Sequence, residues 1–342
     1  MTVNEHQPAV RRPPLRLAVA LVAPLALSMA ACGEPTGSSD DAATYPTDTL
    51  SIMVPADPGG GFDGLGRAVQ STLDGAGLVT TTIEVSNVPG AGGTIGLTEL
   101  IDRHEGNADQ LMITGYTTVG AAVVNDTYRL TDATPIATLT EEAGVFVVAA
   151  DSPYGTIADV VDAWKADPTA VKFAGGSLGG PDHIAVGLLA QAAGIDAAVV
   201  RDSYAPYSGT PTEALTAGVA DVLISGISEL EDLVRNGDGR ALAVTAETSQ
   251  DVADASVSTL MDAGYEVVVT NWRGIVAPPG ISEQERRAIV DLIDEMHALP
   301  QWRELVEERG WVDAYRSGDE ATDFFTEQVG SAESVLSQVG VS

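Results

Sequence analysis

The chain has 342 residues, 44% of them hydrophobic, which is enough to bury a core and, at about one to two hundred residues per domain, to form two lobes. Lysine and arginine total 17 against 49 acidic residues, and the resulting net charge of −32 excludes a basic track for phosphates, so nucleic acid is not expected as a partner. The lone cysteine, Cys32, excludes an internal disulfide framework, and four scattered histidines indicate no metal-ligand cluster.

The N-terminal segment has the pattern of an export signal. Three arginines precede an apolar run at residues 17–31, which is shorter than the roughly 20 apolar residues of a membrane-spanning helix. Residues 1–31 are therefore predicted to be a cleaved signal peptide. Residues 29–32 resemble a bacterial lipobox, which predicts that Cys32 is acylated. Residues 32–47, rich in Gly, Ser, Asp, Thr and Pro, predict a flexible tether.

Strands and helices are predicted to alternate from residue 50 onward. Short apolar or alternating runs predict strands at Leu50–Val54, Thr81–Ser86, Gln110–Thr114, Val145–Ala150, Val171–Ala174, Val199–Val200, Asp221–Ser225, Ala241–Thr245 and Glu266–Val269. Runs with helical spacing predict helices at Asp63–Leu73, Thr94–Ile101, Ile157–Ala166, Asp182–Ala193, Ser208–Ala217 and Glu283–Ala298. This order predicts an α/β fold with mainly parallel sheets.

Glycine-rich turns precede several of the predicted helices. A helix N-terminus carries unpaired N–H groups and the positive end of the dipole, and glycine lets a ligand approach the backbone closely. Because the chain has only two lysines, such turns are the candidates for holding a small anion. The candidate turns are Gly59–Asp63, Gly90–Thr94, Gly175–Gly180 and Tyr207–Thr210. One such turn alone is usually a tight connection, whereas four favour a ligand with more than one carboxylate.

Two enzyme hypotheses also fit parts of these turns. The pattern Gly59-x-Gly61-x-x-Gly64 matches the dinucleotide fingerprint, but prolines stiffen the turn and Glu84 lies within its strand. The pattern Gly175-x-Ser177-x-Gly179 matches a nucleophile elbow, which keeps a surface-anchored serine esterase as an alternative. The histidine that such a serine needs is poorly supplied. His183 belongs more simply to the next helix, and His297 lies near the end of a charged helix.

Two of the turns resemble the signatures of a known family. Residues 54–63, Val-Pro-Ala-Asp-Pro-Gly-Gly-Gly-Phe-Asp, followed by Arg67, resemble the first signature of the substrate-binding receptors of tripartite tricarboxylate transporters, the TctC or Bug-type receptors. Residues 87–94, Asn-Val-Pro-Gly-Ala-Gly-Gly-Thr, resemble the second signature. The likeness continues in order to the C-terminus. The aromatic Phe62 before the signature aspartate is more similar to the citrate-type branch.

The resemblance implies a two-lobed, periplasmic-binding-protein-like (Venus flytrap) fold. The first lobe is expected at residues 48–149 plus 273–342 and the second at 150–272, with crossovers near Ala149–Ala150 and Asn271–Gly274. Asp63 is expected to cap its helix or hold its loop rather than to touch an anion, with Arg67 as a surface partner. The ligand-binding residues implied are Gly59, Gly60, Gly61, Phe62, Asp63, Gly90, Ala91, Gly92, Gly93, Thr94, Thr114, Ser177, Gly179, Gly180, His183, Tyr207, Ser208, Gly209, Thr210 and Ser225.

The function implied is capture, without chemistry, of a small di- or tricarboxylate, with citrate favoured. The protein is expected to be a monomeric lipoprotein on the outer face of the bacterial cell membrane, without cofactor or metal, that delivers its ligand to large and small membrane subunits for secondary uptake. A carboxylate sensor that feeds a signalling kinase remains an alternative.

Overall fold

Two mixed sheets and a small hairpin form the strands of the structure. The computed structural model describes residues 45–207 and 211–340. The predicted leader and Cys32 lie outside these residues. The strands are β1 (Leu50–Val54), β2 (Ile83–Asn87), β3 (Gln110–Gly115), β4 (Thr134–Glu141), β5 (Gly144–Ala149), β6 (Phe173–Gly175), β7 (Tyr204–Pro206), β8 (Val222–Gly226), β9 (Gly239–Val244), β10 (Gln250–Val252), β11 (Ala255–Val257), β12 (Arg273–Ala277) and β13 (Val312–Ser317).

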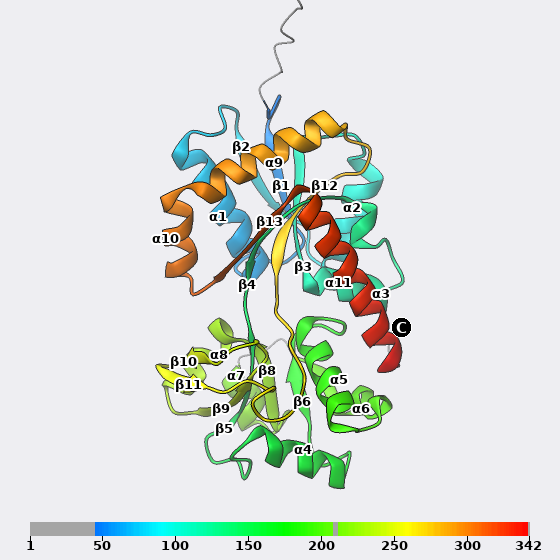
Figure 1. The fold of residues 1–342 in the computed structure, drawn as a ribbon, viewed down its shortest axis with the longest axis vertical. Helices are drawn as coiled ribbons and strands as arrows, with labels where there is room; N and C mark the ends of the chain where they lie inside the picture. Colours follow the sequence, from blue (N-terminus) through cyan, green and yellow to red (C-terminus); the bar gives the residue numbers. More distant parts are fainter. Residues whose placement is uncertain (1–44, 208–210, 341–342) are drawn as a thin grey trace, which may run out of the picture. The chain divides into compact units, whose positions relative to one another are not determined.

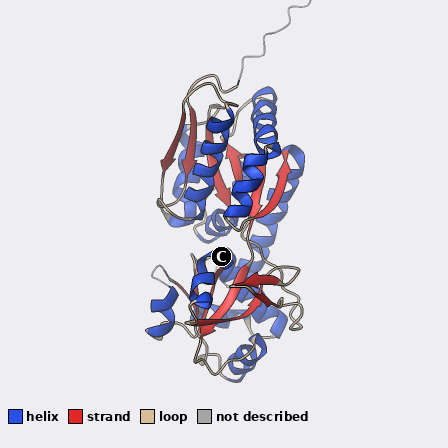
Figure 2. Cartoon of the chain, turned by 90° about the vertical axis from the view of Figure 1, so that its left-hand side faces the viewer, coloured by secondary structure: helices blue, strands red, loops and turns tan. Residues whose placement is uncertain are grey.

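Helices cover the faces of both sheets (Figures 1 and 2). They are α1 (Gly61–Ala76), α2 (Thr94–Arg103), α3 (Tyr116–Val124), α4 (Ile157–Ala166), α5 (Pro181–Ala193), α6 (Val200–Ser203), α7 (Pro211–Thr216), α8 (Ile227–Arg235), α9 (Glu283–Ala298), α10 (Pro300–Glu308) and α11 (Gly318–Gln338), with short 3₁₀ turns η1 (Ala91–Gly93), η2 (Leu130–Asp132) and η3 (Ala197–Val199). Within the described part of the chain, no helix combines the length and apolar character needed to cross a membrane.

The first sheet has the order β13-β4-β12-β3-β1-β2 and the second the order β7-β6-β8-β5-β9. Pairs β1–β2, β1–β3, β6–β7 and β6–β8 are parallel, while β12, β4, β13, β5 and β9 pair antiparallel. The α/β expectation is correct, but the expectation of mainly parallel sheets is wrong. The chain crosses between the sheets after β4 and before β12, and the strands next to each crossing pair antiparallel with their neighbours.

Strand β5 corrects the predicted position of the first crossover. It pairs with β8 and β9 in the second sheet, so the chain leaves the first sheet at Glu142–Ala143 rather than at Ala149–Ala150. The return falls just before Arg273, within the predicted Asn271–Gly274 segment. The division into two lobes stays a prediction, and this pairing places residues 144–149 with the second sheet.

Local sequence explains where the main helices begin and end. Helix α1 buries the stripe Leu65, Val69 and Leu73 and ends at Gly77, whose φ of 66° is the left-handed conformation that glycine adopts readily. Helices α4 and α9 start with capping boxes at Thr156 and Ser282. Both helices have the predicted bounds.

Two predicted strands are wrong. Val199–Val200 lies in the η3–α6 turn, where Val200 is fully buried, and Glu266–Val269 carries no strand. Both segments contribute apolar side chains to the core, and so short a run does not distinguish a strand from another buried segment. The end of the predicted tether is also ordered: Tyr45 donates a hydrogen bond to the carbonyl oxygen of Ala108 at 3.0 Å.

A continuous apolar core extends between elements of both sheets. Trp272 is 1% exposed and packs against Tyr116 of α3 and Phe325 of α11. Helix α11 contacts α3 and β4 and also α5, which covers β6 of the second sheet. Elements on the first sheet are therefore packed directly against α5.

Candidate functional site

The first glycine loop leads from β1 into α1 and leaves the start of the helix uncapped. Gly60 is the N-cap residue and supplies no side chain, so the first N–H groups of α1 have no side-chain partner there. Asp63 holds the loop, because its carboxylate accepts from Gly59 N–H at 2.9 Å, Asn87 Nδ2 at 3.0 Å and Arg67 Nε at 2.9 Å. The hydrogen bond from Arg67 is the main cause that lowers the pKa of Asp63 to about 2. The expectation that Asp63 holds the loop is confirmed.

The second glycine loop, η1, leads into α2 and lies against α3. A Cβ on Gly92 would meet Cβ of Ala121 at 2.5 Å, and one on Gly93 would meet Oγ1 of Thr118 at 2.8 Å. Both glycines also have positive φ, 65° and 95°, which a larger residue adopts only with strain. Both positions therefore require glycine, because of the close contacts and because of the positive φ. Gly93 is also the N-cap residue of α2 and, like Gly60, supplies no side-chain cap.

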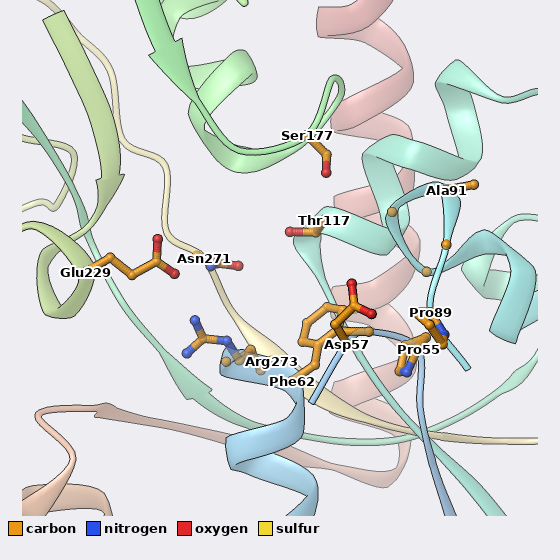
Figure 3. Close-up of a pocket in the computed structure, with 15 residues that line it drawn as sticks. Pro55, Asp57, Phe62, Pro89, Ala91, Thr117, Ser177, Glu229, Asn271 and Arg273 are labelled. Atoms are coloured by element: carbon orange, nitrogen blue, oxygen red, sulfur yellow. The ribbon is translucent and has the colours of Figure 1, made fainter. Parts of the chain in front are cut away.

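The two loops form one wall of a cavity of about 410 Å³, within the usual range for small-molecule sites. The cavity is lined by Pro55, Ala56, Asp57, Gly61, Phe62, Pro89, Gly90, Ala91, Gly92, Gly93, Thr117, Ser177, Glu229, Asn271 and Arg273. Figure 3 shows Glu229 and Asn271 on one side and Asp57 and Phe62 on the other. Residues that follow strands of both sheets therefore meet around it.

The second sheet contributes Ser177 and Glu229 to this cavity. Ser177 lies in the loop between β6 and α5, which Asp182 holds by accepting from Gly176 N–H at 2.7 Å. Burial is the main cause that raises the pKa of Asp182 to about 7, and the carboxylates of Glu229 and Glu142 raise it further. Glu229, on α8, accepts a hydrogen bond from Ser225 Oγ at 2.5 Å.

His183 belongs to the support of this loop and not to the cavity. It is 1% exposed, its Nδ1 accepts from Gly179 N–H at 3.0 Å, and its ring stacks on Tyr204. Burial lowers the pKa of His183 to about 4, so the ring is neutral at pH 7. Among the described residues, no hydrogen bond joins Ser177 to a histidine, and the arrangement that an esterase needs is not assembled here.

A buried ion pair lies where the chain crosses between the sheets. Arg273 Nη2 donates to Glu142 Oε2 at 3.3 Å, with both side chains about 5% exposed or less. Glu142 Oε1 accepts from the backbone N–H of Ser228 at 2.7 Å, at the start of α8. Arg273 is the one arginine or lysine that lines the cavity within the described residues.

The structure brings only part of the predicted site to the cavity. Gly61, Phe62, Gly90, Ala91, Gly92, Gly93 and Ser177 line it. Tyr207 and Ser225 line a neighbouring cavity, which shares Glu229. Gly59, Gly60, Asp63, Thr94, Thr114, Gly179, Gly180 and His183 line neither. Ser208, Gly209 and Thr210 lie outside the described residues.

The polar lining residues that the sequence analysis missed are Asp57, Thr117, Glu229, Asn271 and Arg273. Asn271 and Arg273 lie in the predicted second crossover, and this position between the sheets could have indicated that they line the site. Glu229 lies in a helix with a polar exposed face, and nothing local marks it as a lining residue.

Residues 67–341 match the family model described as "Tripartite tricarboxylate transporter family receptor". The chain belongs to this family. The receptor is 25% identical over 331 residues to protein BugT of Bordetella pertussis, covering 94% of this chain and 97% of the relative. The family consists of transporter receptors, which bind a solute and are not enzymes.

Solved structures share the receptor's fold. One is MatC from Rhodopseudomonas palustris with bound malate, with a TM-score of 0.69 and 23% identity over 85% of this chain and 100% of that one. Another is an R. palustris protein with adipate, with a TM-score of 0.69 and 19% identity over 86% and 98% of the two chains. These matches establish the two-sheet periplasmic-binding-protein-like fold.

Proposed function

We propose that the receptor binds a small di- or tricarboxylate in the cavity between its glycine loops, with citrate as the favoured ligand. The observation that carries the proposal is the convergence on this cavity of two helix starts without side-chain caps, at Gly61 and at Gly90–Gly93, and one arginine, Arg273. Backbone N–H groups at helix starts and a guanidinium are donors that suit carboxylate oxygens. The malate and adipate named for the two R. palustris proteins are of the same chemical class.

The proposed mechanism is closure of two lobes on the ligand. Gly61 and Gly90–Gly93 belong to the first sheet's loops, whereas Ser177 and Glu229 follow strands of the second. A ligand that touches both groups makes more contacts when they approach, so it shifts the population toward the closed form. Phe62 supplies an apolar wall beside these donors.

The surroundings of the cavity carry negative charge. Asp57 and Glu229 are exposed at its edge, in a protein whose net charge is −32, so a carboxylate is not drawn in over long range. Binding then depends on short charge-assisted hydrogen bonds inside the cavity. A citrate complexed with a cation carries less charge and is a natural second probe.

We further propose that the receptor acts outside the cytoplasm, anchored by a lipid on Cys32, and passes its ligand to the large and small membrane subunits of a tripartite transporter for secondary uptake. The family match supports the transport role, and the leader-like sequence of residues 1–31 supports export. A sensor role that feeds a kinase remains the competing assignment for the same binding event.

A thermal-shift screen tests the ligand class. The purified chain is heated with citrate, citrate plus Mg²⁺, malate, adipate, acidic amino acids or aromatic acids. A ligand that binds only the folded state adds about 2.7 kcal/mol of stability at a hundredfold excess over its dissociation constant. A rise in the midpoint with citrate and little with the other acids supports the proposal and its citrate assignment. The absence of a shift with every carboxylate would overturn it.

A further inference from the structure

One donor and one acceptor at the cavity wall are buried without hydrogen-bond partners. Nη1 of Arg273 and Oδ1 of Asn271 both have no partner and almost no exposed surface. Both residues line the cavity, and Asn271 lies two positions before Arg273, the first residue of β12. Unpaired buried groups are costly, so a partner for both is expected in the working protein.

The surroundings of Arg273 concentrate positive charge at this wall. Gly61 is the first residue of α1, and a Cβ there would lie 2.7 Å from Nη2 of Arg273, so the guanidinium packs against the helix start. A cation at a helix N-terminus is unfavourable, because both carry positive charge. Glu142 offsets part of this charge through Nη2 but is itself committed to the start of α8. Nη1 of Arg273 has no partner and can donate a hydrogen bond to an anion.

Asn271 presents the opposite chemistry. Its backbone N–H is used, since it donates to the carbonyl oxygen of Glu142 at 2.8 Å. Figure 3 shows its side chain among the residues around the cavity, and its oxygen is shielded from solvent without a hydrogen-bond partner. An amide oxygen accepts hydrogen bonds only, so it repels a carboxylate and suits a hydroxyl group. A ligand ammonium group could also donate to this oxygen, but it would be repelled by the nearby guanidinium of Arg273. A neutral hydroxyl is not repelled.

We propose that Arg273 binds one carboxylate of the ligand through Nη1, that Asn271 accepts a hydrogen bond from a ligand hydroxyl, and that Glu142 positions Arg273. This inference rests on the proposed function and deepens it, since it makes the preferred ligand a hydroxycarboxylate. Nη1 of Arg273 and Oδ1 of Asn271 are shielded in the present conformation, so a ligand reaches them only when neighbouring side chains move. We therefore expect these two hydrogen bonds to form during closure of the lobes.

Isothermal titration with two matched ligand pairs tests the hydroxyl contact. Citrate is compared with tricarballylate, which lacks its hydroxyl, and malate with succinate. The wild-type chain is expected to prefer the hydroxylated member of each pair by about fivefold, the value of one neutral hydrogen bond. Asn271→Ala is expected to lose this preference while binding tricarballylate and succinate as before. The exposed Asn236→Ala, at the end of α8, serves as the control and keeps the preference.

Removing Arg273 tests the carboxylate contact. Arg273→Gln alone leaves the Glu142 charge buried, so the double variant Arg273→Gln with Glu142→Gln is measured as well. In both, affinity for all four acids is expected to fall about tenfold to a hundredfold, as for a charge-assisted hydrogen bond. Arg235→Gln, which removes an exposed arginine paired with Asp232, is the control and is expected to leave affinity unchanged. Glu142→Gln alone is expected to weaken binding less and to keep the hydroxyl preference.

The outcomes separate the two proposals. If the wild-type chain binds none of the four acids, the proposed function fails. If it binds them and the folded double variant binds equally well, Arg273 is not the anchor and this inference fails while the proposed function stands. An unchanged preference in Asn271→Ala, or tighter binding of aspartate than of malate by the wild-type chain, overturns the role of Asn271.

Discussion

Gly120 in α3 and Gly179 in the loop before α5 lie so close together that neither has room for a side chain. A Cβ on Gly120 would overlap the carbonyl oxygen of Gly179, and one on Gly179 would lie 2.6 Å from the oxygen of Gly120. Helix α3 packs on β3 of the first sheet, and the Gly179 loop follows β6 of the second. This pair of glycines is thus a direct backbone contact between elements of the two sheets.

Gly120→Ala is expected to lower the free energy of unfolding by about 1–3 kcal/mol, because the new methyl group meets backbone that cannot turn aside. Urea denaturation measures the change. The control is Gly330→Ala in α11, where no heavy atom lies within 4 Å and the substitution is expected to stabilise by about 0.5–1 kcal/mol. If Gly120→Ala is as stable as Gly330→Ala, the close contact is absent.

Asp63→Ala is expected to destabilise the chain near neutral pH by about 2–3 kcal/mol, since it removes the acceptor for Gly59, Arg67 and Asn87 from a site that is 4% exposed. The folded-state pKa of Asp63, about 2, lies below its ordinary value, so this stabilisation is present above about pH 4 and is lost as the pH falls toward 2. Urea denaturation at several pH values measures the free energy of unfolding of variant and wild type, and the two values are expected to converge as the pH falls.

Asp74→Ala provides the comparison for Asp63, because Asp74 is exposed on the same helix. It is expected to change stability by less than about 0.5 kcal/mol. A constant difference between Asp63→Ala and wild type at all pH values would contradict the ionic role given to Asp63.

The sequence predicts elements that are bounded by clear signals, whereas the 21-residue helix α11 was not predicted. Helices 157–166 and 283–298 have their predicted bounds because capping boxes at Thr156 and Ser282 mark their starts. The strands β4 and β13 were missed, and with them the mixed character of the first sheet. Both are set by pairing with distant partners, so their local sequence does not specify them. The first crossover was predicted too late in the chain for the same reason, because the local sequence of β5 does not specify which sheet it joins.

The glycine loops of the site were predictable because their backbone needs residues without side chains. The charged residues of the cavity were not. Arg273 becomes a lining residue only because Glu142 and the side-chain-free Gly61 hold it there, and these three residues lie far apart in sequence. His183, which the sequence predicts as a ligand residue, does not line the cavity, because it is buried against Tyr204 by packing that local sequence does not contain.

Ser177→Ala is expected to weaken citrate binding by about three- to tenfold, if its hydroxyl donates to the bound ligand from the second sheet's side of the cavity. Titration calorimetry measures the affinity, with the exposed Ser334→Ala in α11 as the control. The same preparations are assayed with simple esters, and no hydrolysis is expected from the wild-type chain. Hydrolysis that disappears in Ser177→Ala would contradict a binding role.

Asp182→Asn is expected to gain stability relative to wild type as the pH rises. The folded-state pKa of Asp182, about 7, lies above the value of 3.8 for a free side chain, because the carboxyl is buried and faces Glu229 and Glu142. The folded state therefore holds more protons than the unfolded state between these values, and wild-type stability falls as the pH rises through that range. Asparagine keeps an acceptor for Gly176 N–H but does not titrate.

Urea denaturation near pH 5 and near pH 8 checks this sign, and the variant's gain between them is expected to be about 1–4 kcal/mol. Because both proteins contain His183, its protonation at low pH cancels in the comparison. Asp159→Asn is the control, since hydrogen bonds from Thr156 and Gly155 lower the pKa of Asp159 and its carboxylate is therefore ionised in both the folded and the unfolded state across this range. That variant is expected to differ from wild type by the same amount at both pH values. If Asp182→Asn likewise shows no change between the two pH values, the carboxyl of Asp182 is charged and solvated in the folded protein.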